Sequence, residues 1–185
     1  MGIAFLLKLA TMKFASNKQF QDTYSNVKRI VVIGDIHGDF NILLTCLKKA
    51  NVINSNKEWI GGSTHIVQLG DIFDGGCRGN ETSFQDNEVE IYKFLIGLKK
   101  RALKKGGNVI LIIGNHEIMN FNNNYNYVQK GTSHKCLVQT KNDYHYKFDK
   151  NRSCNMNDRN KLFSIPNGPL SKSMTKYMKG VVKIN

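Results

Sequence analysis

The sequence predicts an α/β fold, a parallel-strand sheet flanked by helices. Three apolar, β-branched runs, at residues 30–33, 66–69 and 109–113, each lead into a short string that pairs Gly with Asp or Asn. The two segments between these runs carry apolar residues at helical spacing. Strands that alternate with helices are typical of a parallel sheet, and ligands gather beyond the carboxyl ends of its strands.

The first strand is expected at residues 28–34, and a helix at residues 39–50 follows it. Apolar residues at positions 40, 43, 44 and 47 keep helical spacing, and Asp39 stands where an N-cap belongs. Both crossovers between successive strands are expected to join parallel neighbours. The other elements expected before residue 114 are a strand at 64–70, a helix at 87–104 and a strand at 108–113.

The remainder of the chain is less regular. Residues 121–166 are rich in Asn and show no clear period, so we interpret them as an insertion over the strand ends and a candidate lid. Residues 167–179 are expected to form a short helix, and residues 180–185 to begin a strand. Residues 1–25 are interpreted as a leader of unknown use.

Composition narrows the class of protein. The 185 residues are 41% hydrophobic without an apolar run long enough to cross a bilayer, which predicts a soluble globular protein with no membrane partner. The net charge of +13 favours anionic partners, and we favour phosphorylated substrates over nucleic acid because the basic residues are scattered. The four dispersed cysteines lack a C-x-x-C pair and indicate reduced thiols in the cytoplasm.

Three strings carry the chemistry: GDIHGD at residues 34–39, GDIFDGG at 70–76 and GNHE at 114–117. In this order they resemble the motifs GD-x-H-G, GD-x-x-D-R-G and G-N-H-E of the calcineurin-like metallophosphoesterase superfamily. Within it the sequence is most similar to Shewanella-like serine/threonine protein phosphatases, through GNHEIMN at residues 114–120 and GPL at 168–170.

The resemblance implies a metallophosphoesterase-type sheet. It covers residues 28–185, which match about the N-terminal half of the family's catalytic domain. We therefore expect residues 26–185 to form the N-terminal part of such a domain, an incomplete α/β sandwich that is a fragment or the product of a split gene.

The resemblance also assigns roles to the motif residues. It implies two divalent ions, which the mixed oxygen and imidazole ligands suggest are Mn, Fe or Zn. Asp35 and His37 would hold the first ion, Asp71 would bridge both, and Asn115 would hold the second and contact the substrate. His116 would be the general acid, and Asp74 would accept its other N–H. The residues alone leave open a helix-capping histidine and a plain turn aspartate.

Two departures from the family pattern bear on activity. Gly75 occupies the position of the motif Arg that grips the substrate phosphate, and Arg78 is the candidate replacement. Two His ligands of the second ion have no counterpart in the expected order, so the second metal site is expected to be incomplete in this chain.

The leading hypothesis is a metal-dependent phosphoesterase that hydrolyses phosphomonoesters, most similar to a protein serine/threonine phosphatase. The resemblance implies attack by a metal-bound hydroxide on a phosphorylated protein or a small phosphoester. One alternative is a dinucleoside tetraphosphate hydrolase. Another is a truncated, non-catalytic remnant that binds a metal and acidic partners. The sequence leaves the oligomeric state open.

Overall fold

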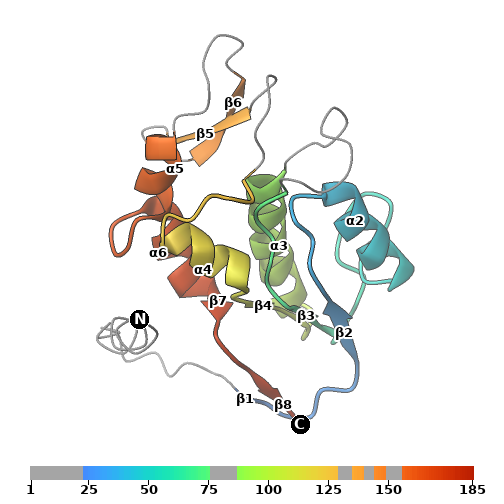
Figure 1. Ribbon diagram of the computed structural model, residues 1–185. Coiled ribbons are helices and arrows are strands. Elements are labelled where there is room, and N and C mark those ends of the chain that lie inside the picture. The colour runs from blue at the N-terminus through green and yellow to red at the C-terminus, as the bar shows by residue number, and fades with distance from the viewer. Residues whose placement is uncertain (1–22, 76–86, 129–134, 140–143, 149–155) are drawn as a thin grey trace.

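The computed structural model describes residues 23–75, 87–128, 135–139, 144–148 and 156–185 (Figure 1). Its helices are α2 (Phe40–Lys49), α3 (Glu88–Leu103), α4 (Asn115–Phe121), α5 (Met156–Phe163) and α6 (Pro169–Tyr177). Its strands are β1 (Thr23–Tyr24), β2 (Ile30–Ile33), β3 (His65–Gln68), β4 (Asn108–Ile112), β5 (Lys135–Gln139), β6 (Tyr144–Phe148), β7 (Met178–Lys179) and β8 (Lys183–Ile184).

The central sheet has four parallel strands in the order β2-β3-β4-β7. Its register places Val31 beside Ile66 and Ile66 beside Val109. Side chains alternate between the two faces of a strand, so these three residues point to one face. The predicted α/β class with parallel strands is confirmed.

One face of the sheet packs against the helices. Leu43 and Leu47 of α2 and Leu95 and Leu98 of α3 are fully buried against it. The predicted N-cap of α2 is confirmed, because the Asp39 carboxylate accepts a hydrogen bond from the backbone N–H of Ile42. The same core continues into α5 and α6 through Leu162, Phe163, Leu170 and Met174.

The other face carries a smaller apolar cluster. Val67 and Ile110 lie there beneath Tyr24, where β1 pairs in parallel with β8. Two residues of the segment interpreted as a leader, Thr23 and Tyr24, thus belong to the folded domain. On the same face Val32 of β2 remains 59% exposed, so the cover over this side is partial.

The C-terminal segment differs from the predicted single strand at residues 180–185. Met178 is only 3% exposed and pairs with Leu111, so β7 begins two residues earlier, where an apolar side chain reaches the helix-side core. Val181 is 75% exposed and stands outside any strand. The chain then forms β8 in a separate pair with β1, with Thr23 beside Lys183.

Residues 121–166 contain more regular structure than their sequence suggests. β5 and β6 form an antiparallel hairpin, with Lys135 opposite Phe148. The hairpin lies at the opposite end of the molecule from β1 and β8, and α5 lies beside it (Figure 1). That this segment is an insertion and a lid stays a prediction. Among the described helices, none combines the length and apolarity that a membrane span requires.

Candidate active site

Three loops meet at the carboxyl ends of β2, β3 and β4. The backbone N–H groups of Ile36 and His37 both donate to the carbonyl oxygen of Asp71, at 3.0 and 2.9 Å. The N–H of Gly38 donates to the carbonyl oxygen of Ile72 at 2.8 Å. The loop after β2 is therefore attached to the loop after β3 by backbone hydrogen bonds, which fixes the spacing between their side chains.

A buried carboxylate joins the second loop to the third. Glu117, in the first turn of α4, accepts backbone N–H bonds from Asp71 at 2.9 Å, Ile72 at 2.8 Å and Gly114 at 2.7 Å. Its burial raises the pKa of this carboxyl group, and the three N–H bonds oppose that rise. No signal in the sequence indicated its contact with the β3 loop.

The glycines of two motifs permit this close approach. Gly70 has a φ of +98°, and a Cβ there would collide with the backbone of Gly114. A Cβ on Gly114 would in turn collide with the carboxylate of Asp71. Any larger residue at either position would push the two loops apart.

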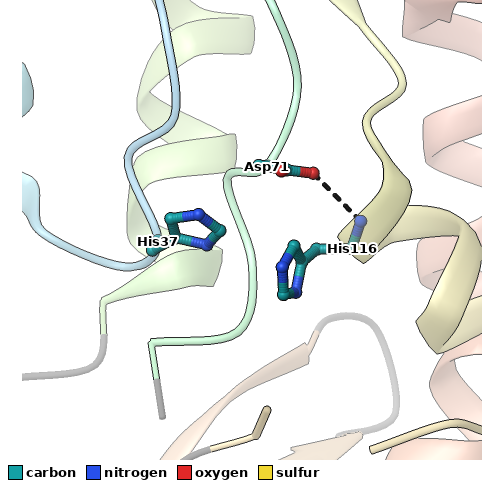
Figure 2. A group of neighbouring side chains, drawn as sticks. All are labelled: His37, Asp71 and His116. Atoms are coloured by element: carbon teal, nitrogen blue, oxygen red, sulfur yellow. Dashed lines mark hydrogen bonds between the residues drawn. The ribbon is translucent and has the colours of Figure 1, made fainter. Parts of the chain in front are cut away.

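His37, Asp71 and His116 converge where the loops meet (Figure 2). All three are buried, and each offers a ligand atom within 4.8 Å of those of the other two. The backbone N–H of His116 donates to Oδ1 of Asp71 at 2.9 Å, the dashed line in Figure 2. His37 and Asp71 adopt left-handed φ values of +47° and +54°, which the surrounding loop bonds hold in place.

The donor atoms fit a divalent metal ion. Nδ1 of His37 lies 3.0 Å from the carbonyl oxygen of Phe73, and because a carbonyl only accepts, Nδ1 carries the proton. Nε2 then carries the lone pair; it is buried and has no hydrogen-bond partner among the described residues. An imidazole lone pair beside carboxylates, with the other ring nitrogen held by a carbonyl, is typical of a transition-metal ligand.

The structure brings some of the other predicted ligands to this cluster. Asp35 places Oδ2 3.7 Å from Nε2 of His37, and its side chain is 63% exposed. Asn115 is the exposed first residue of α4, directly before His116. Arg78 lies outside the described residues. The metal-binding and substrate-binding roles of these residues stay predictions.

His116 contacts the predicted partner. Its Nδ1 lies 3.1 Å from Oδ2 of Asp74, whose side chain is completely buried. Burial, followed by the charge of Glu88, raises the pKa of Asp74, and the nearby Arg159 guanidinium opposes the rise. The contact is present, while the catalytic roles of the two residues stay predictions.

Three further residues around Asp74 had not been singled out from the sequence: Glu88, Asn120 and Arg159. The Asn120 side-chain amide donates to both carboxylate oxygens of Asp74, at 2.9 and 2.8 Å. Asn120 lies one helical turn after His116, and this spacing predicts that the two side chains lie on the same face of the helix. Arg159 had no such signal, because it lies within the aperiodic segment at residues 121–166 and reaches the site only through the fold.

Comparison with known proteins places these features in a family. The sequence matches the family described as calcineurin-like phosphoesterase over residues 28–181. It is 41% identical over 128 residues to Shewanella-like protein phosphatase 1 of Plasmodium berghei, covering 67% of this chain and 33% of that protein. It is 40% identical over 116 residues to Shewanella-like protein phosphatase 2 of Arabidopsis thaliana, covering 63% and 27%.

A solved structure is also similar. The cold-active protein-tyrosine phosphatase of a psychrophilic Shewanella species superposes with a TM-score of 0.51 at 39% identity. That likeness covers 58% of this chain and 30% of the phosphatase. The chain spans about a third of the length of the curated relatives that it matches.

Proposed function

The chain belongs to the calcineurin-like phosphoesterase family, and on that premise we propose that it is a metal-dependent phosphomonoesterase. The convergence of His37, Asp71 and His116 at the carboxyl ends of three parallel strands carries this proposal. The leading substrate is a protein phosphorylated on serine or threonine. A tyrosine phosphoester is the second candidate, because a solved relative is described as a protein-tyrosine phosphatase.

Asp35, His37, Asp71 and Asn115 are proposed to hold divalent ions, with Mn, Fe or Zn as the candidates. His37 supports this assignment best, since its buried Nε2 has no hydrogen-bond partner among the described residues. The chemistry that bound divalent ions supply in such a site is activation of a water nucleophile and neutralisation of charge on the phosphoryl group.

The protein's own contribution to hydrolysis is proton transfer at His116. The water oxygen forms a new bond to phosphorus, and the ester P–O bond breaks with its electron pair on the leaving oxygen. That oxygen takes the proton from Nε2 of His116, and a proton released by the water restores it. Asp74 accepts the Nδ1–H at 3.1 Å, which keeps Nε2 as the proton donor.

Substrates and location follow from the same proposal. Phosphorylated proteins and small phosphoesters are anionic and suit the +13 chain. A reducing, cytoplasmic location is proposed from the dispersed cysteines, of which Cys46 is free and exposed.

Mn²⁺-dependent phosphate release by residues 1–185 tests the proposal, with Asp71→Asn as the matched control. The substrates are a phosphoserine peptide, a phosphotyrosine peptide and diadenosine tetraphosphate. We expect turnover of the phosphopeptides that falls by at least about 10²-fold in Asp71→Asn. Preferred cleavage of the dinucleotide would support the tetraphosphate hydrolase instead. Mn²⁺ binding without turnover of any substrate would overturn the proposal in favour of a non-catalytic, metal-binding protein.

A further inference from the structure

Arg159 is a buried cation that reaches the candidate site from outside the three motifs. It lies on α5, it is 6% exposed, and its guanidinium makes hydrogen bonds with three side chains. Nε donates to Oδ1 of Asn120 at 2.7 Å, and Nη2 donates to Oδ1 of Asp74 at 3.0 Å. Nη1 and Nη2 donate to the two carboxylate oxygens of Glu88. One residue thus bonds both to Asp74, the partner of His116, and to the neighbouring carboxylate of Glu88.

The partners of Arg159 all act on Asp74. Glu88 accepts the backbone N–H of Asp74 at 2.9 Å, and Asn120 donates to both oxygens of its carboxylate. Asp74 and Glu88 are carboxylates with no exposed surface, and Arg159 bonds to both of them. Without a guanidinium between them, two buried like charges would face each other at high cost.

The guanidinium plane is itself held in place. Its carbon lies 5.0 Å from the ring centroid of Phe163 and 5.9 Å from that of Tyr125. Aromatic faces attract a desolvated guanidinium and limit its rotation. The guanidinium N–H groups therefore point at Asp74 and Glu88 in one fixed orientation. A residue that positions another side chain needs such a fixed orientation.

We propose that Arg159 is the positioning residue of the general acid: it fixes the Asp74 carboxylate so that Oδ2 accepts the Nδ1–H of His116. This inference rests on the proposed function, in which His116 gives its other proton to the leaving oxygen. Arg159 does not touch the reacting atoms. Its effect reaches the reaction through Asp74, and it should matter most when the leaving group needs a proton.

The dependence on the leaving group separates positioning from a structural role. Phenyl phosphate releases a basic phenolate that needs protonation, whereas 2,4-dinitrophenyl phosphate releases an anion that needs almost none. We expect Arg159→Met to lower turnover of phenyl phosphate about 10²-fold and that of dinitrophenyl phosphate less than about threefold. Mn²⁺ affinity should change less than about threefold, since no predicted metal ligand bonds to Arg159.

Leu162→Ala is the matched control for simple destabilisation. Leu162 is fully buried on the same helix and belongs to the apolar core, and its side chain has no polar atom that could bond within the Asp74 network. We expect this variant to affect both esters equally, through its folded fraction alone. Equal losses on both esters in Arg159→Met, or no loss on either, would overturn the proposal.

A measurement without turnover keeps the inference independent of the proposed function. Nitrogen-15 NMR of the metal-free protein reports separately whether Nδ1 and Nε2 of His116 carry protons. We expect a protonated Nδ1 in the unmodified protein and in Leu162→Ala, and a mixture of tautomers in Arg159→Met. If the chain shows no phosphatase activity, the proposed function fails, and the tautomer still decides the role of Arg159.

Arg159→Lys covers the case in which Arg159→Met does not fold. Lysine keeps the positive charge beside the two carboxylates but cannot donate to Asn120, Asp74 and Glu88 at once. We expect an intermediate loss of about tenfold on phenyl phosphate and partial loss of the Nδ1–H tautomer. A folded Arg159→Lys with unchanged turnover of phenyl phosphate and an unchanged tautomer would overturn the proposal.

Discussion

The two sides of the candidate site are built in opposite ways. The closed side consists of Asp74, Glu88, Asn120 and Arg159, which are between 0% and 6% exposed and bond to one another. The open side consists of Asp35, His37 and Asn115. There the Asp35 side chain is 63% exposed, and Nε2 of His37 has no hydrogen-bond partner among the described residues.

This difference separates the residues that fix geometry from those that offer donor atoms. On the closed side the lone pairs and protons of the carboxylates are used within the protein, so the orientation of His116 is set by the fold. On the open side the lone pairs remain available, as a metal ligand requires. Substitutions on the closed side should therefore lower turnover and stability. Substitutions on the open side should lower metal affinity.

The largest expected effect is that of His116→Gln, at the boundary between the two sides. His116 contacts Asp74, yet it also lies within ligand distance of His37 and Asp71. If it belongs functionally to the closed side, turnover of phenyl phosphate should fall about 10²- to 10³-fold because the general acid is lost. Mn²⁺ affinity, measured by calorimetry, should change less than about threefold. A tenfold or greater loss of Mn²⁺ affinity would instead make His116 a ligand of the open side.

The next largest effect is a loss of stability in Glu117→Gln, because this substitution weakens the hydrogen bonds that join the loop after β3 to the loop after β4. The carboxylate accepts three short backbone N–H bonds, and a glutamine would turn an N–H₂ group toward some of those donors. We expect the free energy of unfolding in urea to fall by about 3 kcal/mol.

Glu58→Gln is the control for Glu117→Gln, because Glu58 is exposed and its carboxylate accepts from Asn54 rather than from the motif loops. It should change the free energy of unfolding by less than about 0.5 kcal/mol. A similarly small change in Glu117→Gln would mean that the loops are held together by other contacts.

A smaller effect is expected from Asp35→Asn, on the open side. The exposed Asp35 side chain contributes little packing, so the free energy of unfolding should stay within about 0.5 kcal/mol. Mn²⁺ affinity should fall about tenfold, since an amide oxygen is a weaker ligand than a carboxylate. Asp39→Asn is the matched control: asparagine still caps α2, and Mn²⁺ affinity should be unchanged. Equal affinities in all three proteins would remove Asp35 from the ligand set.

The smallest effect concerns a cation away from both sides. The half-buried Lys99 donates to Oδ1 of Asn108 and the carbonyl oxygen of Val109, and burial lowers its pKa from 10.5 to about 8. Between these values the unfolded chain holds a proton that the folded protein has lost. Stability should therefore rise with pH from about 8 to about 10.5, by on the order of 1 kcal/mol.

Urea unfolding of Lys99→Met at pH 7.5, 9 and 10.5 tests this slope. The variant should lack the rise, while Lys100→Met, at the exposed neighbouring position, should keep it. Parallel curves for all three proteins would assign the pH dependence to other groups. A loss of Mn²⁺ affinity in Lys99→Met would show that the start of β4, where Lys99 bonds to Asn108 and Val109, is coupled to the candidate site.

Much of the fold follows from local patterns. The apolar runs became β2, β3 and β4 in parallel register, and Asp39 caps α2 as its position suggested. The place of each strand in the chain and the cap of α2 depend on neighbours within a few residues, where periodicity and capping act. The parallel pairing follows from the helix between successive strands. The strand expected at residues 180–185 is instead divided into β7, which begins at Met178, and β8 at Lys183–Ile184, because the partners of β7 and β8 lie far away in the chain.

The sequence by itself determined that Asp35, His37, Asp71, Asp74 and His116 would gather at one edge of a sheet. Parallel neighbouring strands end at the same edge, so a motif at each strand end suffices for that inference. Only the tertiary structure decided which residues hold them there. Glu117 and Arg159 bond to loops 46 and 85 residues away, and no local spacing encodes which buried carboxylate meets which donor.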